Sequence, residues 1–396
     1  MQRFRKMNNK KDHSFKYSFW NYVDAGTIPL SAVKEWKECG INLPMSPVYK
    51  PGVSKKEDII SLLDACEKNG IKMLISDVRT TFKKLIEVGE EKFRGLVKEA
   101  YEDFGRHPAT YGFYIGDEPN FDEMKYFIQA QNIVNEIAKG LETFGNLLPY
   151  FGAYFEPGDK EEREKKYVNT INEYLTKTNT KLTGFDQYTQ CNDVEYDQET
   201  GINSYYYGLD RFRELCEAKG VEFFMSLLSV GHWQYRIPTQ DDIRWQISTA
   251  VAHGARGIVW FYFYSFFNEP SYRMSPYYAF NRKTSMYDKI QYEQWFFQKR
   301  YGELINRIKL HSIYHLNDNY HYGKKWLPDS YIEKIETKQQ YPLIISYYKE
   351  YEGNGEYVSM VNASQTRQNH IKSYFRNGDV KEAWLATGEI IFYKVK

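Results

Sequence analysis

Residues 105–120 read GRHPATYGFYIGDEPN, a short apolar strand that leads into two adjacent carboxylates and a proline. Successive side chains of a strand point to opposite faces, so Phe113 and Ile115 share one face. The opposite face carries, in order, Gly112, Tyr114, Gly116 and Glu118. The pattern predicts a strand whose C-terminal tip presents Glu118, which is how a (β/α) barrel builds a functional site. The alternative is that Asp117 and Glu118 only cap the next helix, because acids favour helix N-termini.

The rest of the chain repeats this strand-then-helix unit. Apolar strand runs alternate with helix-period runs, which is typical of a parallel α/β fold. The expected strands are residues 17–23, 42–45, 72–77, 111–116, 148–154, 182–188, 223–229 and 257–264. Eight units in about 300 residues predict a (β/α)₈ TIM barrel. A doubly wound sheet would need a Gly-rich phosphate loop after the first strand, and the AGTIP run at 25–29 does not supply one.

The C-terminal part has a different pattern. After Leu310, short β-rich runs are separated by turns such as Asn354-Gly355 and Asn377-Gly378. We therefore expect two domains: a catalytic barrel over residues 1–309, and a small antiparallel, sandwich-like β-domain over residues 310–396.

The charge and composition of the chain limit the classes of partner that it is expected to bind. The 53 basic residues nearly balance the 52 acidic ones, so neither a nucleic acid nor a membrane surface is an expected partner. The four cysteines fit no metal motif, and no Glu follows His311 in its pair with His315, so we expect no metal and no cofactor. Residues 1–16 are basic without an apolar run. This predicts a cytoplasmic protein, or a secreted or periplasmic one whose leader was removed.

The Gly-Asp-Glu-Pro run at 116–119 resembles the acid/base segment of barrel-fold glycoside hydrolases related to clan A, the β-galactosidase-like barrels. A C-terminal β-domain is common among such barrels. The resemblance implies that Glu118 protonates the leaving oxygen of a sugar. In clan A the preceding residue is usually an Asn that binds a sugar hydroxyl, and here Asp117 takes that place. A nearby Asp117 charge would raise the pKa of Glu118, as an acid requires.

Glycoside hydrolysis usually needs a second carboxylate across the scissile bond. Clan A places a Glu at the tip of strand seven, but residues 227–233 read LLSVGHW and carry no acid. Asp186 is the first substitute, because strand alternation points it and Tyr188 into the barrel mouth. Glu269, after strand eight, is the second, and Asp77 is the third. Each could instead be a loop acid paired with an arginine or a backbone N–H. A partner displaced from strand seven leaves room for a water molecule, which favours inversion.

Aromatic residues recur at the same expected end of the barrel. Their rings can stack on sugar faces while the hydroxyls stay wet, although a single ring more often serves in packing. A histidine beside a tryptophan is also more often structural. The expected substrate-binding set is Asp117, Trp20, Tyr22, Asp77, Tyr154, Tyr188, His232, Trp233 and Tyr264.

These observations predict a glycoside hydrolase that acts on an oligosaccharide or glycan, with Glu118 as acid and Asp186 or Glu269 as nucleophile or base. Two alternatives remain open. A barrel that binds carbohydrate without cleaving it would explain the missing acid of strand seven. A barrel enzyme of another class could use Glu118 to abstract a proton.

Overall fold

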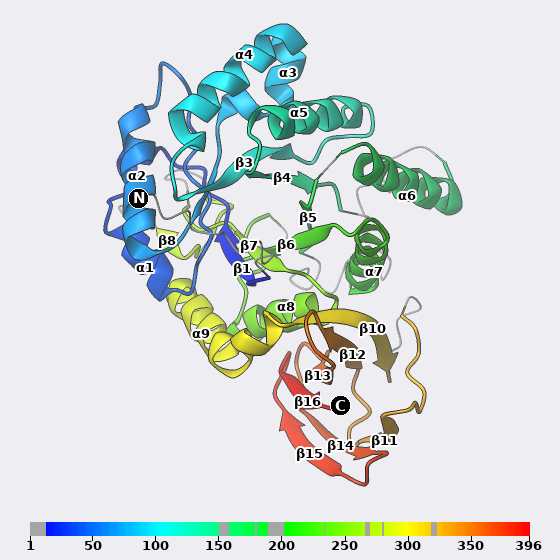
Figure 1. Ribbon diagram of the computed structural model, residues 1–396. Helices are drawn as coiled ribbons and strands as arrows, with labels where there is room; N and C mark the ends of the chain where they lie inside the picture. The colour runs from blue at the N-terminus through cyan, green and yellow to red at the C-terminus, as the bar shows by residue number, and fades with distance from the viewer. Residues whose placement is uncertain are drawn as a thin grey trace, which may run out of the picture.

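A computed structural model describes residues 13–149, 158–178, 180–188, 202–233, 235–265, 270–278, 281–317 and 323–396. Tyr154 and Glu269, two of the expected site residues, lie outside these ranges. Helices surround a ring of strands, and the C-terminal strands form a separate group beside the ring (Figure 1). Within the described residues, no helix combines the length and the apolar character needed to cross a membrane.

The central sheet is parallel and has seven assigned strands. In spatial order they are β1 (Lys16–Phe19), β7 (Gly257–Phe261), β6 (Glu222–Leu228), β5 (Leu182–Asp186), β4 (Glu142–Leu147), β3 (Thr110–Asp117) and β2 (Met73–Ile75). Residues 42–46 fill the gap between β1 and β2. There Leu43 N donates to Tyr17 O at 3.1 Å, and Leu74 N donates to Pro44 O at 2.9 Å. Met45 also bridges Leu74 in parallel, so the expected eight-stranded barrel is confirmed.

Helices cover the outside of the barrel. They are α1 (Ala32–Glu38), α2 (Lys56–Asn69), α3 (Phe82–Val88), α4 (Glu90–Ala100), α5 (Met124–Ile137), α6 (Lys160–Lys177), α7 (Ile202–Lys219), α8 (Gln240–Ala252) and α9 (Ser285–Ile305). Three single turns join them: η1 (Ala25–Thr27), η2 (Val78–Thr80) and the π-turn η3 (Tyr101–Gly105). Gly89, whose positive φ of 77° suits glycine, separates α3 from α4.

The position predicted for strand five is wrong. The strand was expected at residues 148–154, but β4 occupies Glu142–Leu147. The helix α5 ends at Ile137, and a turn through Gly140, whose φ of 89° is left-handed and favours glycine, leads directly into β4. The tip of this strand is therefore formed by Asn146 and Leu147, before the position of Tyr154.

The strand alternation predicted for residues 112–118 is also wrong beyond Tyr114. The register of β3 against β4 shifts between Tyr114 and Gly116, so Ile115 and Gly116 both face the helices. A β-bulge of this kind inserts one residue and resets which face each later side chain takes. Asp117 is thereby turned toward the barrel interior, while Glu118 reaches the rim through a left-handed turn with a φ of 40°.

The bulge makes Gly116 sensitive to substitution. A Cβ placed there would lie 2.3 Å from a ring carbon of Phe82, and the φ of 150° is one that L side chains rarely adopt. We expect Gly116→Ala to lower the free energy of unfolding by about 1–3 kcal/mol, measured by chemical denaturation. Gly95→Ala in α4 is the matched control, because a Cβ there meets no atom within 4 Å. The control is expected to be neutral or stabilising. Equal losses in both variants would contradict this role of Gly116.

The C-terminal strands form two antiparallel sheets around a shared apolar core. One sheet contains, in spatial order, β10 (Ile308–Leu316), β12 (Leu343–Glu350), β13 (Glu356–Asn362) and β16 (Ile390–Lys394), and the other contains β11 (Ile332–Thr337), β14 (Asn369–Phe375) and β15 (Val380–Leu385). A small hairpin, β8 (Tyr277–Tyr278) with β9 (Arg282–Lys283), precedes α9.

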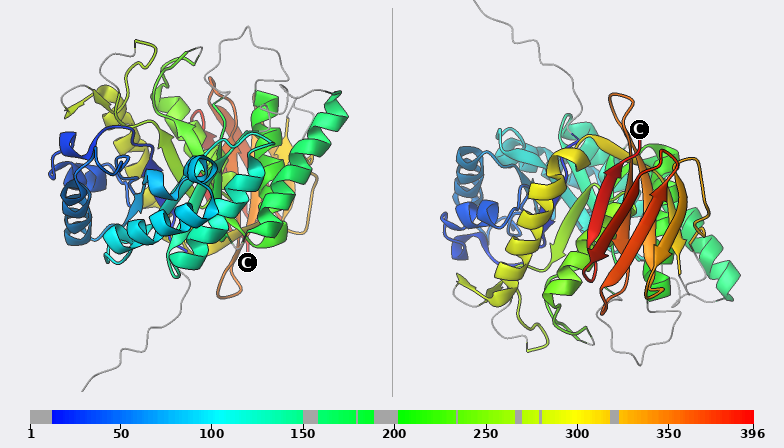
Figure 2. Two further views of the ribbon diagram at one scale, coloured as in Figure 1. Left: turned by 90° about the horizontal axis from the view of Figure 1, so that it is seen from above. Right: turned by 90° about the horizontal axis from the view of Figure 1, so that it is seen from below.

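This β-domain packs on the barrel, as Figure 2 shows in its right-hand view. The Trp245 indole of α8 donates to Ala363 O at 2.9 Å, and Ser346 Oγ of β12 donates to Ala252 O at 2.9 Å. The expected small antiparallel β-domain after the barrel is confirmed as a fold.

Candidate active site

Three carboxyl groups meet at the C-terminal rim of the barrel. Asp117 ends β3, Glu118 follows it directly, and Asp186 ends β5. Asn146, near the end of the intervening β4, joins them: its Nδ2 donates to Asp117 Oδ1 and to Asp186 Oδ1, each at 2.9 Å. The Asn146 carbonyl accepts from Glu118 N at 2.9 Å. Three neighbouring strand tips thus hold all three acids of the cluster.

Polar side chains from further strands hold Asn146 in this orientation. Its Oδ1 accepts a hydrogen bond from Ser226 Oγ of β6 at 3.2 Å. The Ser226 hydroxyl in turn accepts from the Trp20 indole, just after β1, at 3.1 Å. Since the amide oxygen is occupied by this donor, the amide nitrogen is directed at the carboxyls. The network extends across the barrel mouth from β1 to β3.

The surroundings of the cluster favour a protonated carboxyl. The carboxyls of Glu118 and Asp186 interact closely enough to affect the pKa of each other, and two carboxyls can share a hydrogen bond only when one of them holds a proton. Burial raises the pKa of Asp186 well above its usual range, and the charges of Glu118 and Asp117 raise it further. Burial also raises the pKa of Glu118, although the hydrogen bond from Asp186 opposes that shift. Of the two carboxyls, Asp186 therefore has the stronger tendency to hold a proton.

Solvent reaches the three acids unequally. Asp186 is 8% exposed, whereas the side chains of Asp117 and Glu118 are open to solvent although protein surrounds them closely. Burial and the charge of Glu118 raise the pKa of Asp117, against the hydrogen bond from Asn146. Solvent screening weakens such shifts for the two exposed acids relative to Asp186. A ligand entering the mouth would meet Asp117 and Glu118 first.

Tyrosines line the space around the acids. Burial raises the pKa of Tyr22, Tyr114 and Tyr188, and the negative charges of all three carboxyls raise each of them further. The three phenols therefore lie near the cluster. Trp20 is buried beneath them, with its ring parallel to that of Tyr22 at 6.1 Å between centroids and edge-on to Tyr114 at 5.4 Å. The ring of Trp20 is therefore covered by protein and is not free to stack on a sugar.

Residues after β6 form a further part of the rim. His232 is buried, and burial, aided by the charge of Arg273, lowers its pKa to about 4. It is therefore neutral at physiological pH, and its ring stacks on Tyr272 at 5.5 Å and meets the edge of Tyr188 at 6.1 Å. Trp233, by contrast, is 69% exposed, with a φ of 46°.

Two expected site residues serve the framework instead. Asp77 is fully buried and held by Arg79, whose Nη2 lies 2.8 Å from Asp77 Oδ2 and whose Nη1 lies 2.8 Å from Asp103. Tyr264 belongs to the core between strands and helices, where it accepts from the Trp36 indole at 2.6 Å and stacks on Tyr277. Neither residue joins the acid cluster.

Four residues around the acids or their tyrosines are absent from the expected site: Asn146, Tyr114, Ser226 and Tyr272. Asn146 precedes the strand expected at residues 148–154, whereas β4 begins at Glu142. Tyr114 and Ser226 lie on strand faces that alternation directs inward, so their positions were available from the pattern. Tyr272 lies in no assigned helix or strand, so no periodicity places it.

Comparisons with known proteins support the fold. The chain matches no protein-family model and no curated protein. Among solved structures, it resembles a β-galactosidase from the psychrophilic Marinomonas ef1, with a TM-score of 0.55 and 11% identity over 74% of this chain and 61% of that one. It also resembles a glycoside hydrolase family 5 structure from Bacteroides vulgatus ATCC 8482, with a TM-score of 0.53 and 11% identity over 96% of this chain and 86% of that one.

A third structure, described as a glycoside hydrolase, has a TM-score of 0.54 and 10% identity, covering 96% of this chain and 88% of that one. The chain spans less than two thirds of the β-galactosidase. At these identities the likeness is one of fold, and two of the three matches extend over the C-terminal β-domain as well as the barrel. The fold expected from the resemblance to glycoside hydrolase barrels is confirmed.

Proposed function

We propose that this protein is a glycoside hydrolase that cleaves an oligosaccharide or glycan at the carboxyl rim, with Glu118 as general acid. The carrying observation is the close pairing of solvent-reached Glu118 with buried Asp186 at the C-terminal end of the barrel strands, where burial raises the pKa of both carboxyls. A general acid must hold its proton at the working pH, and a carboxyl does so only when its surroundings raise its pKa. This carboxyl pair meets that requirement.

In the proposed reaction, Glu118 donates a proton to the leaving oxygen as the bond to the anomeric carbon breaks. Asp186 holds the shared proton beneath Glu118 and supplies it for the transfer. Asp117, fixed by Asn146, accepts a hydrogen bond from a sugar hydroxyl. The negative charge that remains on the three carboxyls stabilises the positive charge that develops on the sugar ring.

The proposal also needs a carboxylate across the scissile bond. Glu118 and Asp186 interact closely, whereas the two acids are about 5–5.5 Å apart in retaining enzymes and about 6.5–9.5 Å apart in inverting ones. Asp186 could act across the bond only after parting from Glu118 when a sugar enters. Glu269, outside the described residues, is the other candidate. The inversion favoured by the sequence therefore stays a prediction.

A carbohydrate-binding barrel without hydrolytic activity is the second candidate. The observation that favours it is the tip of β6, where Ser229, Val230 and Gly231 offer no acid. In this case the tyrosines and Asp117 would hold a sugar, and the shared proton would only stabilise a crowded set of acids.

Exposed Trp233 is expected to serve as a sugar platform on the rim. We expect Trp233→Ala to raise KM for an oligosaccharide by roughly 2- to 10-fold with little change in kcat, because ring stacking contributes about 0.5–1.5 kcal/mol. Trp384→Ala is the matched control, since Trp384 is 54% exposed but lies on β15 of the other domain. An unchanged KM in the Trp233 variant, or the same rise in both, would reject the platform.

A screen of aryl glycosides tests the proposed function. The purified full-length protein and its Glu118→Gln variant are incubated with a panel that varies the sugar and the anomer. We expect the wild type to cleave at least one glycoside, and the variant to cleave the same glycoside far more slowly. If no glycoside or glycan is cleaved while a sugar still quenches tryptophan fluorescence, the binding barrel is the correct description.

A further inference from the structure

A second cluster of polar residues lies where the barrel meets the C-terminal domain. Asp210 of α7, His253 directly after α8, and His315 of β10 each place one ligand atom within 4.8 Å of those of the other two. The three residues are 6%, 0% and 4% exposed. α8 ends just before β7 begins, so His253 lies near the N-terminal end of the strands, opposite the acid cluster.

His253 is prepared to act as a ligand. Its Nδ1 lies 2.7 Å from Thr249 O, and a carbonyl only accepts, so Nδ1 carries the hydrogen and Nε2 carries a lone pair. That Nε2 is buried and has no hydrogen-bond partner among the described residues. A backbone carbonyl that fixes one ring nitrogen while the other stays available is typical of metal-binding histidines. An unpartnered lone pair is otherwise destabilising in a buried position.

Ion pairing alone does not account for the cluster. Arg213 Nη2 lies 3.5 Å from Asp210 Oδ1, a long contact, and Arg213 also reaches Glu217 at 3.2 Å and Glu214 at 3.4 Å. This arginine can support Asp210 from behind, as hydrogen-bonded partners of ligating carboxylates do. It leaves the Nε2 of His253 unexplained.

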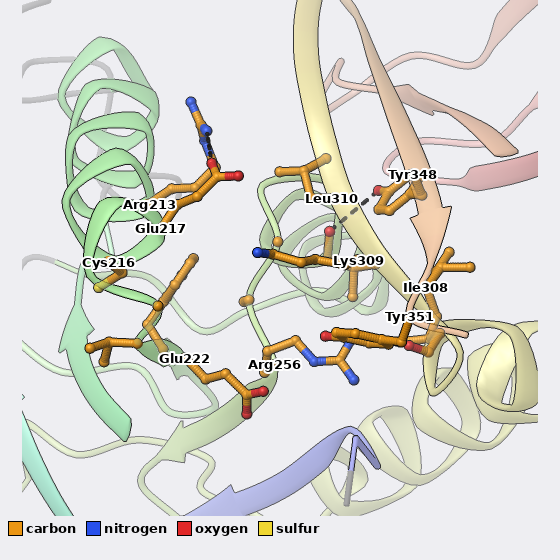
Figure 3. A pocket seen from close by; sticks show the side chains of 17 residues that line it. Arg213, Cys216, Glu217, Glu222, Arg256, Ile308, Lys309, Leu310, Tyr348 and Tyr351 are labelled. Atoms are coloured by element: carbon orange, nitrogen blue, oxygen red, sulfur yellow. Dashed lines mark hydrogen bonds and ion pairs between the residues drawn. The ribbon is translucent and has the colours of Figure 1, made fainter. Parts of the chain in front are cut away.

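A neighbour of the cluster lines a pocket. Arg213 also lines a pocket between α7, the start of β10 and the C-terminal strands (Figure 3). Leu310 and Tyr348 line the same pocket from the β-domain side. Solvent in this pocket therefore reaches the arginine that contacts Asp210.

We propose that Asp210, His253 and His315 bind a divalent transition metal, with zinc as the probe, and that this ion links the β-domain to the barrel. Two imidazoles and one carboxylate suit zinc, which takes nitrogen and oxygen ligands in tetrahedral geometry and leaves its fourth position to water. With bonds of about 2.0–2.2 Å, tetrahedral ligand atoms lie about 3.3 Å apart, so the three side chains would draw together around the ion.

This proposal revises the expectation that the protein has no metal site. The sequence offered only the spacing of His311 and His315, and His311 is exposed on β10. The fold instead gives His315 two partners that are distant in sequence. The metal site is independent of the proposed glycoside hydrolysis.

Metal analysis of the untagged full-length protein tests the proposal. The protein is stripped with a chelator, dialysed against zinc and analysed by mass spectrometry of the elements. We expect about one zinc per chain in the wild type and close to none in His253→Gln and Asp210→Asn. Zinc should raise the Tm of the wild type and not that of either variant.

Two controls make the outcome decisive. His107→Gln removes a histidine from an exposed group with Asp64 and Glu67, where His107 Nε2 already pairs with Asp64 at 3.1 Å. His311→Gln removes the neighbouring histidine of β10. Both controls should keep full zinc binding. If His253→Gln fails to fold, cobalt replaces zinc in the wild type, and a visible absorption band typical of tetrahedral coordination is expected. A wild type that binds neither ion, or a His253 variant that binds as much zinc as His107→Gln, would overturn the proposal.

Discussion

Glu118→Gln is expected to lower kcat/KM for a glycoside with a poor leaving group by on the order of a hundredfold or more. The substitution preserves the shape of the side chain but removes the proton that the leaving oxygen needs. The loss should be much smaller for a highly activated aryl glycoside, because its leaving group departs with little protonation. Steady-state kinetics on the two substrates give the ratio that identifies an acid.

The matched control for this prediction is Glu91→Gln on the exposed side of α4. It changes charge and shape in the same way, away from the barrel mouth, and should leave both substrates unaffected. Small and equal losses on both substrates in Glu118→Gln would show that Glu118 only caps the chain before α5. A large loss on both substrates would indicate that Glu118 does more than donate a proton.

Asp186→Asn is expected to displace the basic limb of the pH–rate profile to lower pH. In the wild type, burial and the neighbouring charges raise the pKa of Asp186, so the pair is expected to keep a proton above the usual range of a carboxyl. An asparagine still donates a hydrogen bond to Glu118 but cannot hold the proton. Glu118 then loses its proton at lower pH. At a pH above the new limb, the rate should fall about tenfold for each pH unit by which the limb is displaced. Activity at acidic pH should be unchanged.

Asp77→Asn is the matched control, because Asp77 is another buried acid of the strand tips. Its partner is Arg79, so this substitution should lower stability and leave the position of the basic limb unchanged. If Asp186→Asn loses activity equally at every pH, Asp186 acts as nucleophile or base rather than as the holder of the proton.

The barrel could be predicted from the sequence because its determinants are local. Each strand is an apolar run and each helix has its own period, so the alternation establishes the α/β barrel before any contact is known. Even the weak strand at residues 42–45 was expected, and it closes the barrel against Tyr17 and Leu74. Glu118 and Asp186 both lie at the C-terminal ends of predicted strands. These ends share one rim of a barrel, so the two acids could be placed there from the order of strands and helices.

The details of the site depend on effects that the pattern does not carry. The bulge at Tyr114 and Gly116 reverses strand alternation and turns Asp117 inward. The helix α5 ends at Ile137 and β4 follows directly after the turn at Gly140, which brings Asn146 rather than Tyr154 to the strand tip. Asp77 pairs with Arg79, two residues further along the chain. This pairing depends on the turn between them, which strand and helix periodicity does not describe.

The most direct test of the account is glycan cleavage in water enriched in ¹⁸O. If the rim acids catalyse hydrolysis, the wild type should release a sugar whose new hemiacetal carries one ¹⁸O atom, because water attacks the anomeric carbon. Glu118→Gln should release far less of it from the same glycan. Mass spectrometry of the product, taken before exchange with solvent, measures both results. A glycan that binds but yields no labelled product, or equal labelling with Glu118→Gln, would contradict the assignment of Glu118 as the acid of a glycoside hydrolase.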